Sequence, residues 1–210
     1  MAVKQGKIAA GSGAGRRDEL TADLFRDILK KRNRTKFTKL FSAGKDGFYM
    51  NFSKDKELSF EQAVEIMFKQ LGDWKIMALG SSVHDHVMVR NVSCLFYDEK
   101  IYFKTDKNFR KTQQLYENPN VALCWSGIQA EGIAVNKGLV VDEPGHRFEK
   151  GYEKYLKNSY NAYSHKDTEI LIEVSPKFVE IWDTSDDGRA YQLFLDFDAR
   201  TVETKPYDVK

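Results

Sequence analysis

The sequence predicts a mainly β fold, a closed or nearly closed antiparallel barrel flanked by helices. Roughly seven segments rich in β-branched and aromatic residues occur within about 125 residues, and most follow one another after only a turn. Parallel strands need long crossover connections between them, so a sheet built from βαβ units is disfavoured.

The N-terminal part of the chain is predicted to be an extension outside the barrel. Residues 1–15 are Gly-rich and small, which is typical of a flexible tail. A helix is expected from Thr21, and residues 42–57 are expected to be a linker. The helix rests on apolar residues at helical spacing, namely Leu24, Phe25, Ile28 and Leu29. We therefore place an extension at 1–57 and the barrel domain at 58–210.

The barrel domain is expected to begin with a helix. Ser59 and Gln62 form a capping box, and Gly72 is a typical helix end. The predicted apolar face of this helix consists of Phe60, Val64, Met67, Phe68 and Leu71.

Strands then follow with two further helices between them. The predicted strand segments are 74–81, 87–97, 101–105, 121–125, 131–141, 170–174, 178–182 and 191–197. Ser175-Pro176 is expected to separate the strands 170–174 and 178–182. Helices are predicted at 108–117 and 144–158.

Charge is distributed unevenly along the chain. Residues 1–45 hold twelve Lys/Arg and four Asp/Glu, a net +8, whereas the whole chain carries +2, which leaves −6 for residues 46–210. The stretch Arg26–Lys39 of this basic arm is expected to pack on the acidic body or to bind a polyanion, with a solvated appendage as the alternative, and we do not expect nucleic acid as the partner. No apolar run approaches the roughly 18 residues of a membrane helix, and no secretory core is present, so a cytoplasmic protein without membrane contact is expected.

One segment carries the clearest sign of chemistry. Arg90 lies in a strand expected to pair with 101–105, and Arg110-Lys111 occupy the first turn of the next helix. Cations there are unfavourable for the helix itself but suit a bound anion, because the N–H groups of a helix N-terminus also attract negative charge. A solvated basic turn is the alternative.

The same residues resemble the flavin signature of the pyridoxamine 5′-phosphate oxidase family. The matching pieces are Arg90, Tyr102-x-x-Thr105, Arg110-Lys111, Asn118-Pro-Asn-Val-Ala-Leu123, Glu131-Gly132 and Phe178-Val-Glu-Ile-Trp182. The resemblance covers about 74–198. It implies a six-stranded antiparallel split β-barrel that binds FMN at the interface of a two-fold homodimer.

The resemblance also implies a set of cofactor-binding residues. Arg90 and Lys111 would bind the FMN phosphate with help from Arg110 and Thr105. The backbone of Asn91, Val92 and Ser93 would line the isoalloxazine edge. Lys104 is also expected among the cofactor-binding residues. The family often has Ser where this chain has Phe109, so one phosphate hydroxyl is missing.

Two departures from the family concern the substrate. The vitamin enzyme ends in an Arg-x-His segment, but Arg200 has no His two residues later, and Leu95 replaces a family Lys. We therefore expect no efficient pyridoxamine phosphate oxidase.

Three function classes remain open. The first is an FMN-dependent oxidoreductase that takes a small-molecule substrate or an electron donor such as NAD(P)H. The second is a non-catalytic flavin-binding sensor or carrier, and the third is a nucleic-acid-binding protein. No catalytic residue is identified, and haem or a deazaflavin stays possible as the ligand.

Two other motifs were considered as sites. His84-Asp85-His86 is read as a polar turn rather than a metal site, because no third ligand is near in the sequence. Glu131-Gly132 indicates either a close approach to a ligand or a bend of the barrel.

Overall fold

The computed structural model describes residues 41–44, 47–50, 58–163, 167–184 and 190–207. The chain forms two compact units, Met1–Phe52 and Ser53–Lys210. In the first unit, strand β1 (Phe41–Gly44) pairs with β2 (Gly47–Met50), and Gly44 faces Gly47. The prediction of a linker at 42–57 is therefore wrong over 42–50, where Gly44 and Gly47 flank the turn of a β-hairpin. The helix expected from Thr21 lies outside the described residues.

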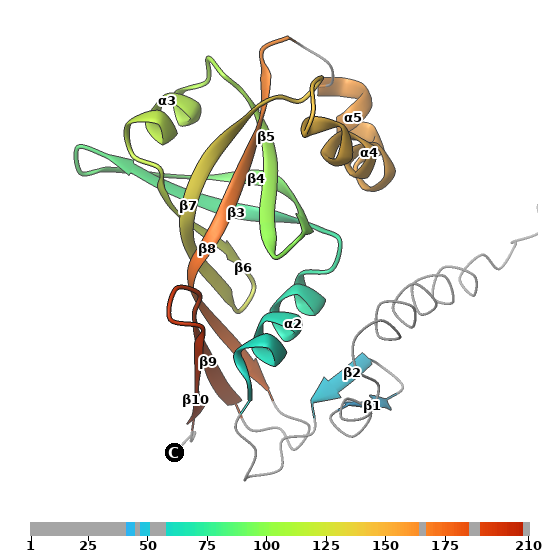
Figure 1. Cartoon of the computed structure of the whole chain (residues 1–210), viewed down its shortest axis with the longest axis vertical. Coiled ribbons are helices and arrows are strands. Elements are labelled where there is room, and N and C mark those ends of the chain that lie inside the picture. Colours follow the sequence, from blue (N-terminus) through green and yellow to red (C-terminus); the bar gives the residue numbers. More distant parts are fainter. Residues whose placement is uncertain (1–40, 45–46, 51–57, 164–166, 185–189, 208–210) are drawn as a thin grey trace, which may run out of the picture. The chain divides into compact units, whose positions relative to one another are not determined.

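The second unit is a closed six-stranded antiparallel barrel (Figure 1). Its strands are β3 (Trp74–Val83), β4 (His86–Tyr97), β5 (Lys100–Asp106), β6 (Asn120–Trp125), β7 (Ile128–Leu139) and β8 (Glu169–Thr184). The hydrogen-bonded order is β8–β5–β4–β3–β6–β7, and β7 pairs again with β8, which closes the ring. The predicted fold class is confirmed.

Strand β8 is continuous, so the predicted break at Ser175-Pro176 is wrong. The β7–β8 register shifts at this point: Glu131 faces Phe178 and Gly132 faces Pro176, which leaves Lys177 without an opposite residue. A shift of this kind accommodates a proline, which has no N–H to give to the ladder. A Cβ on Gly132 would lie 2.6 Å from the carbonyl oxygen of Ser175. Of the two readings of Glu131-Gly132, ligand approach or barrel bend, the structure supports the second, because Gly132 lies at the β7–β8 register shift and against the backbone of β8.

Two strands extend the sheet beyond β8. Strand β9 (Ala190–Asp196) was predicted from the sequence, but β10 (Thr201–Tyr207), which pairs with it, was not. Residues 190–207 therefore form a β-hairpin.

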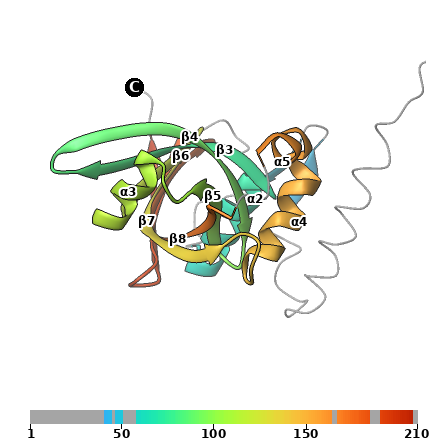
Figure 2. The ribbon, with the colours of Figure 1, turned by 90° about the horizontal axis from the view of Figure 1, so that it is seen from above.

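Four helices flank the barrel within the described residues, namely α2 (Phe60–Leu71), α3 (Arg110–Glu117), α4 (Gly145–Tyr155) and α5 (Lys157–Tyr163). The Ser59–Gln62 capping box of α2 is confirmed. The single helix predicted at 144–158 is two helices, because the backbone leaves the helical conformation at Leu156. Viewed from above, α3 lies on one side of the barrel and α4 and α5 on the other (Figure 2).

Apolar side chains fill the barrel and a second cluster outside it. Fully buried residues of the barrel strands include Met77, Leu79, Ile101, Phe103, Leu123, Ile128, Ile172 and Ile181. Outside the wall, α4 buries Phe148 and Tyr152 against Leu95, Tyr102 and Leu171. None of the helices among the described residues combines the length and the apolar character that crossing a membrane would require.

Candidate functional site

Strand β4 has a partner strand on only one side over most of its length. It pairs with β3 from His86 to Leu95, but its pairing with β5 covers only Leu95, Phe96 and Tyr97. Among the described strands, none pairs with residues 86–94 on the β5 side. Backbone N–H and C=O groups on that edge are available to a ligand. The predicted ring-edge residues Asn91, Val92 and Ser93 lie in this stretch.

Arg90 lies beyond the end of the β4–β5 pairing, opposite Leu79 of β3. The predicted pairing of its strand with 101–105 is confirmed, although Arg90 itself has no partner residue in β5. Its guanidinium instead donates from Nη1 to the hydroxyl of Ser81 at 2.7 Å and to the carbonyl oxygen of Leu79 at 3.4 Å. From Nη2 it donates to Oε1 of Gln114 in α3 at 2.8 Å. All three acceptors are uncharged, so none compensates the charge of the half-buried Arg90.

Arg110 and Lys111 bring two more positive charges to Arg90. They begin α3, whose N-cap residue Phe109 gives no side-chain hydrogen bond and whose first turn contains no acidic residue. Burial, and next the charge of Arg110, lower the pKa of Arg90. Burial, and next the charge of Arg90, lower the pKa of Lys111. Within the described part of the chain, no carboxylate forms an ion pair with any of the three.

The other two predicted polar residues are engaged elsewhere. The hydroxyl proton of Thr112 goes to the carbonyl oxygen of Asp106 at 2.7 Å, so in the 3.2 Å contact between the hydroxyls of Thr105 and Thr112 the donor is Thr105. Thr105 is 4% exposed, and its hydroxyl contacts Thr112 in the first turn of α3. Lys104 points to the opposite face of β5, where its Nζ lies 3.1 Å from Glu149 and 3.2 Å from Glu169. The structure therefore does not bring Lys104 to the cations around Arg90.

We call Arg90, Arg110 and Lys111 the cation cluster. It combines three positive charges, none of them paired with a carboxylate of the described residues, with the N-terminus of α3, and it adjoins the one-sided stretch of β4. The exposed ring of Phe109 stands beside it, 5.6 Å from Lys111 Nζ. Such a donor set fits a phosphate group, and the free edge of β4 fits the alternating N–H and C=O groups of a flavin ring. The residues present are thus chemically suited to FMN.

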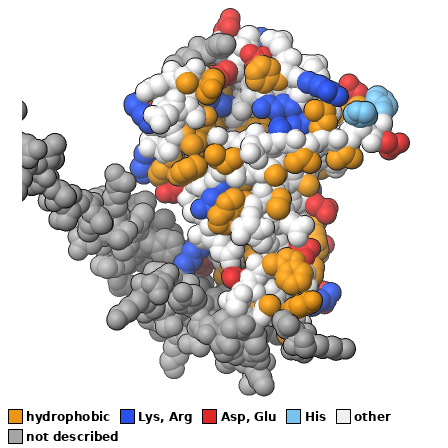
Figure 3. Space-filling view, turned by 180° about the vertical axis from the view of Figure 1, so that it is seen from behind, with side chains coloured by type: hydrophobic (Ala, Val, Ile, Leu, Met, Phe, Trp, Pro, Cys, Tyr) orange, Lys and Arg blue, Asp and Glu red, His pale blue; other side chains and the backbone are white. Residues whose placement is uncertain are grey.

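One face of the barrel exposes large apolar side chains. Val87 and Val89 of β4 are 71% and 67% exposed, and Ile76 of β3, which shares their face, is 53% exposed. Figure 3 shows hydrophobic side chains spread across the upper half of the domain, with Lys and Arg among them. Exposed apolar patches of this kind mark contact surfaces.

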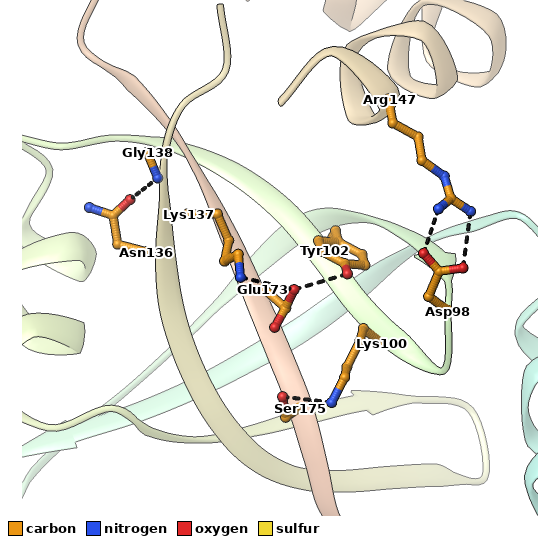
Figure 4. A network of polar contacts seen from close by, with 9 residues as sticks. All are labelled: Asp98, Lys100, Tyr102, Asn136, Lys137, Gly138, Arg147, Glu173 and Ser175. Carbon is orange, nitrogen blue, oxygen red and sulfur yellow. Dashed lines mark hydrogen bonds and ion pairs between the residues drawn. The ribbon is translucent and has the colours of Figure 1, made fainter. Parts of the chain in front are cut away.

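A polar network on the other side of the barrel connects α4 to the strands (Figure 4). Arg147 of α4 bonds to Asp98 in the β4–β5 turn through both terminal nitrogens and lies over the ring of Tyr97. In the same view, Tyr102 donates to Glu173 at 3.0 Å and Lys100 to Ser175 at 2.9 Å. The Arg147–Asp98 pair attaches α4 to the β4–β5 turn, and the other two bonds connect β5 to β8, so we assign these contacts a structural role.

The remaining candidates from the sequence do not form a site. His84 and Asp85 make the β3–β4 turn, as predicted, and His84 is 3.9 Å from Glu117. No group of three possible metal ligands occurs in the described ranges. Cys94 is buried in β4, where burial raises the pKa of its thiol, and Cys124 is exposed in β6.

Comparison with known proteins gives structural similarity only. No family model matches the chain, and no curated protein matches it. Among solved structures, PhzG from Burkholderia lata in complex with tetrahydrophenazine-1-carboxylic acid is 16% identical with a TM-score of 0.48, covering 74% of this chain and 95% of that one. A pyridoxamine 5′-phosphate oxidase-related, FMN-binding protein from Nostoc punctiforme is 9% identical with a TM-score of 0.45, covering 73% and 99%. The heme storage protein HutZ from Vibrio cholerae is 12% identical with a TM-score of 0.47, covering 59% and 95%. The family that the sequence resembles is thus among the structural neighbours, and at these identities the likeness concerns the fold alone.

Proposed function

We propose that this split-barrel chain is an FMN-binding flavoprotein and an FMN-dependent oxidoreductase of a small molecule. The observation that carries the proposal is the cation cluster, in which Arg90 is anchored only by neutral acceptors and no described carboxylate pairs with Arg110 or Lys111. Three positive charges are costly to hold together without an anion among them.

The charges favour FMN over other flavins. A terminal phosphate is close to a dianion at neutral pH, whereas riboflavin has no phosphate and each phosphate of FAD, held by an ester and by the shared anhydride, carries only one negative charge. Each charge-assisted hydrogen bond contributes about 1.5–3 kcal/mol. In this proposal Arg90, Arg110 and Lys111 hold the phosphate, and the backbone of Asn91–Ser93 orients the ring. A bound flavin would supply the capacity to accept and release a hydride or electrons.

A non-catalytic flavin carrier or sensor is the second candidate. It uses the same binding residues, and the sequence and structure identify no catalytic side chain that would separate the two. Anaerobic bleaching of the bound flavin by NADH or NADPH supports the oxidoreductase. A flavin that no donor reduces assigns the protein to the carrier class.

We further propose that the chain works as a two-fold homodimer. The apolar face formed by Ile76, Val87 and Val89 adjoins the one-sided strand edge where the ring would lie. A second copy packed on this face would bury these side chains and shield the flavin ring from water.

The substrate of this proposal is not pyridoxamine phosphate. That substrate brings a second phosphate, which an apolar surface cannot hold. Leu95 is 3% exposed beneath α4, and Arg200 pairs with Glu61 at 2.7 Å and lies over the ring of Phe60. Leu95 has no charge and Arg200 is already paired, so neither can hold the second phosphate. Formation of pyridoxal phosphate under oxygen at about 1 s⁻¹ or faster would contradict this part of the proposal.

The experiment that tests the function is reconstitution of the purified protein with FMN, riboflavin and haem, followed by visible absorption. We expect the spectrum of a bound flavin with FMN, weaker binding of riboflavin, and no haem spectrum. A protein that takes up haem but not FMN would move the chain out of the flavoprotein class.

A further inference from the structure

We infer that Gln114 is a positioning residue that sets Arg90 for an anion without neutralising it, an inference that rests on the proposed flavin-phosphate site. Gln114 lies in the second turn of α3 and is 8% exposed. Its Oε1 accepts hydrogen bonds from Arg90 Nη2 at 2.8 Å and from the Ser81 hydroxyl at 3.0 Å. The same hydroxyl accepts from Arg90 Nη1 at 2.7 Å. Ser81 and Gln114 thus hold both terminal nitrogens of the guanidinium.

The surroundings of Gln114 fix the orientation of its amide. Its Nε2 lies 3.2 Å from the sulfur of Met88, a weak acceptor. With the amide turned around, its NH₂ group would face the guanidinium and the Ser81 hydroxyl would lose its acceptor. Only one orientation therefore satisfies the network.

The neutrality of Gln114 matters as much as its position. A carboxylate at this place could accept the same two hydrogen bonds, but it would compensate the charge of Arg90 and weaken the attraction for a phosphate. A buried amide satisfies the guanidinium hydrogen bonds and leaves the charge available.

Gln114 also links the elements that carry the cations. It stands four residues after Arg110, so both lie on the same side of α3. The bond from Gln114 to Arg90 therefore connects the helix that carries Arg110 and Lys111 to strand β4. Loss of this bond is expected to disturb the phosphate contacts while leaving the ring edge of β4 unchanged.

A double-mutant cycle tests the inference. The dissociation constants of FMN and riboflavin are measured for the wild type, Gln114→Leu, Arg90→Ala and the double variant. Gln113→Leu is the matched control, because Gln113 is the exposed neighbour whose amide donates to the carbonyl oxygen of Lys107. We expect Gln114→Leu to weaken FMN binding about tenfold and riboflavin binding less than about twofold. In the Arg90→Ala background the same substitution should change FMN binding less than about twofold, because Gln114 acts through Arg90.

Several results would overturn the inference. These are equal losses for FMN and riboflavin, losses that add in the double variant, or an unchanged FMN affinity in Gln114→Leu while Arg90→Ala is impaired. If Gln114→Leu does not fold, Gln114→Met, which keeps the side-chain length but removes the amide, takes its place in the cycle. A wild-type protein that binds no FMN and is not stabilised by inorganic phosphate would overturn the proposed function and this inference together.

Discussion

Arg90 and Lys111 are the residues on which the binding of a phosphate depends most directly. Each would contribute a charge-assisted hydrogen bond, so Arg90→Ala and Lys111→Ala should each weaken FMN binding about ten- to a hundredfold. Fluorescence titration with FMN and riboflavin measures the effect, and the loss should be confined to FMN. Lys150→Ala, which removes an exposed charge on α4, is the control and should leave both affinities unchanged. Unchanged FMN affinity in both site variants would refute the assignment.

The lowered pKa of Lys111 predicts how FMN affinity depends on pH. Burial and Arg90 lower its pKa below the usual 10.5 in the free protein, whereas a bound phosphate favours its charged form and raises the pKa again. FMN affinity should therefore be constant while Lys111 is protonated in both states and fall as the pH rises through the lowered pKa, below 10.5. The ratio of FMN to riboflavin affinity isolates the phosphate contribution. Lys111→Arg, whose charge persists at high pH, should remove this decline, and a decline that persists in this variant would exclude Lys111 as its source.

The sequence could predict some residues of the site but not all. Arg90, Arg110 and Lys111 were recognisable because charged residues in a strand and in a first helical turn conflict with their local setting. Ser81 and Gln114 gave no such signal, since neutral residues far apart in sequence become partners only through the fold. Lys104 and Thr105 are neighbours, yet strand alternation sends them to opposite faces of β5. A sequence motif cannot show which of the two faces is the site.

At the scale of elements, the periodic strands were predictable and the irregular ones were not. Six barrel strands alternate or are continuously apolar, and their turns lie where polar residues interrupt them. Strand β10 escaped prediction because its side chains are nearly all exposed, which leaves no alternation of polar and apolar residues. The continuity of β8 escaped because its proline is accommodated by a register shift with β7, a long-range feature.

The attachment of α4 to the barrel gives a prediction that separates stability from binding. Lys104 of β5 is 6% exposed between Glu149 of α4 and Glu169 of β8. Lys104→Met would leave two buried carboxylates without this cation, which costs about 3–5 kcal/mol of unfolding free energy. Chemical denaturation measures this loss. FMN affinity of the folded variant should be unchanged, since α4 and α3 lie on different sides of the barrel (Figure 2). A specific loss of FMN affinity would instead return Lys104 to the cofactor site.

At the scale of the whole molecule, the apolar face of β3 and β4 predicts the assembly. Light scattering should give twice the 24.2 kDa mass of one chain. Val89→Glu should shift the mass measured by light scattering toward that of a single chain and weaken flavin binding, because a carboxylate in an apolar interface loses its hydration. Val141→Glu, at another exposed valine, which follows β7, is the control and should stay dimeric. A monomer mass at all concentrations with flavin bound would show that one chain is sufficient.

The central claim is that the cation cluster holds the phosphate of FMN, and its most direct test is the visible spectrum of the purified protein after incubation with FMN and gel filtration. The account predicts a yellow protein with the spectrum of an oxidised flavin, stoichiometric FMN on denaturation, and loss of the colour in Arg90→Ala. A folded protein that emerges colourless from an excess of FMN would contradict it.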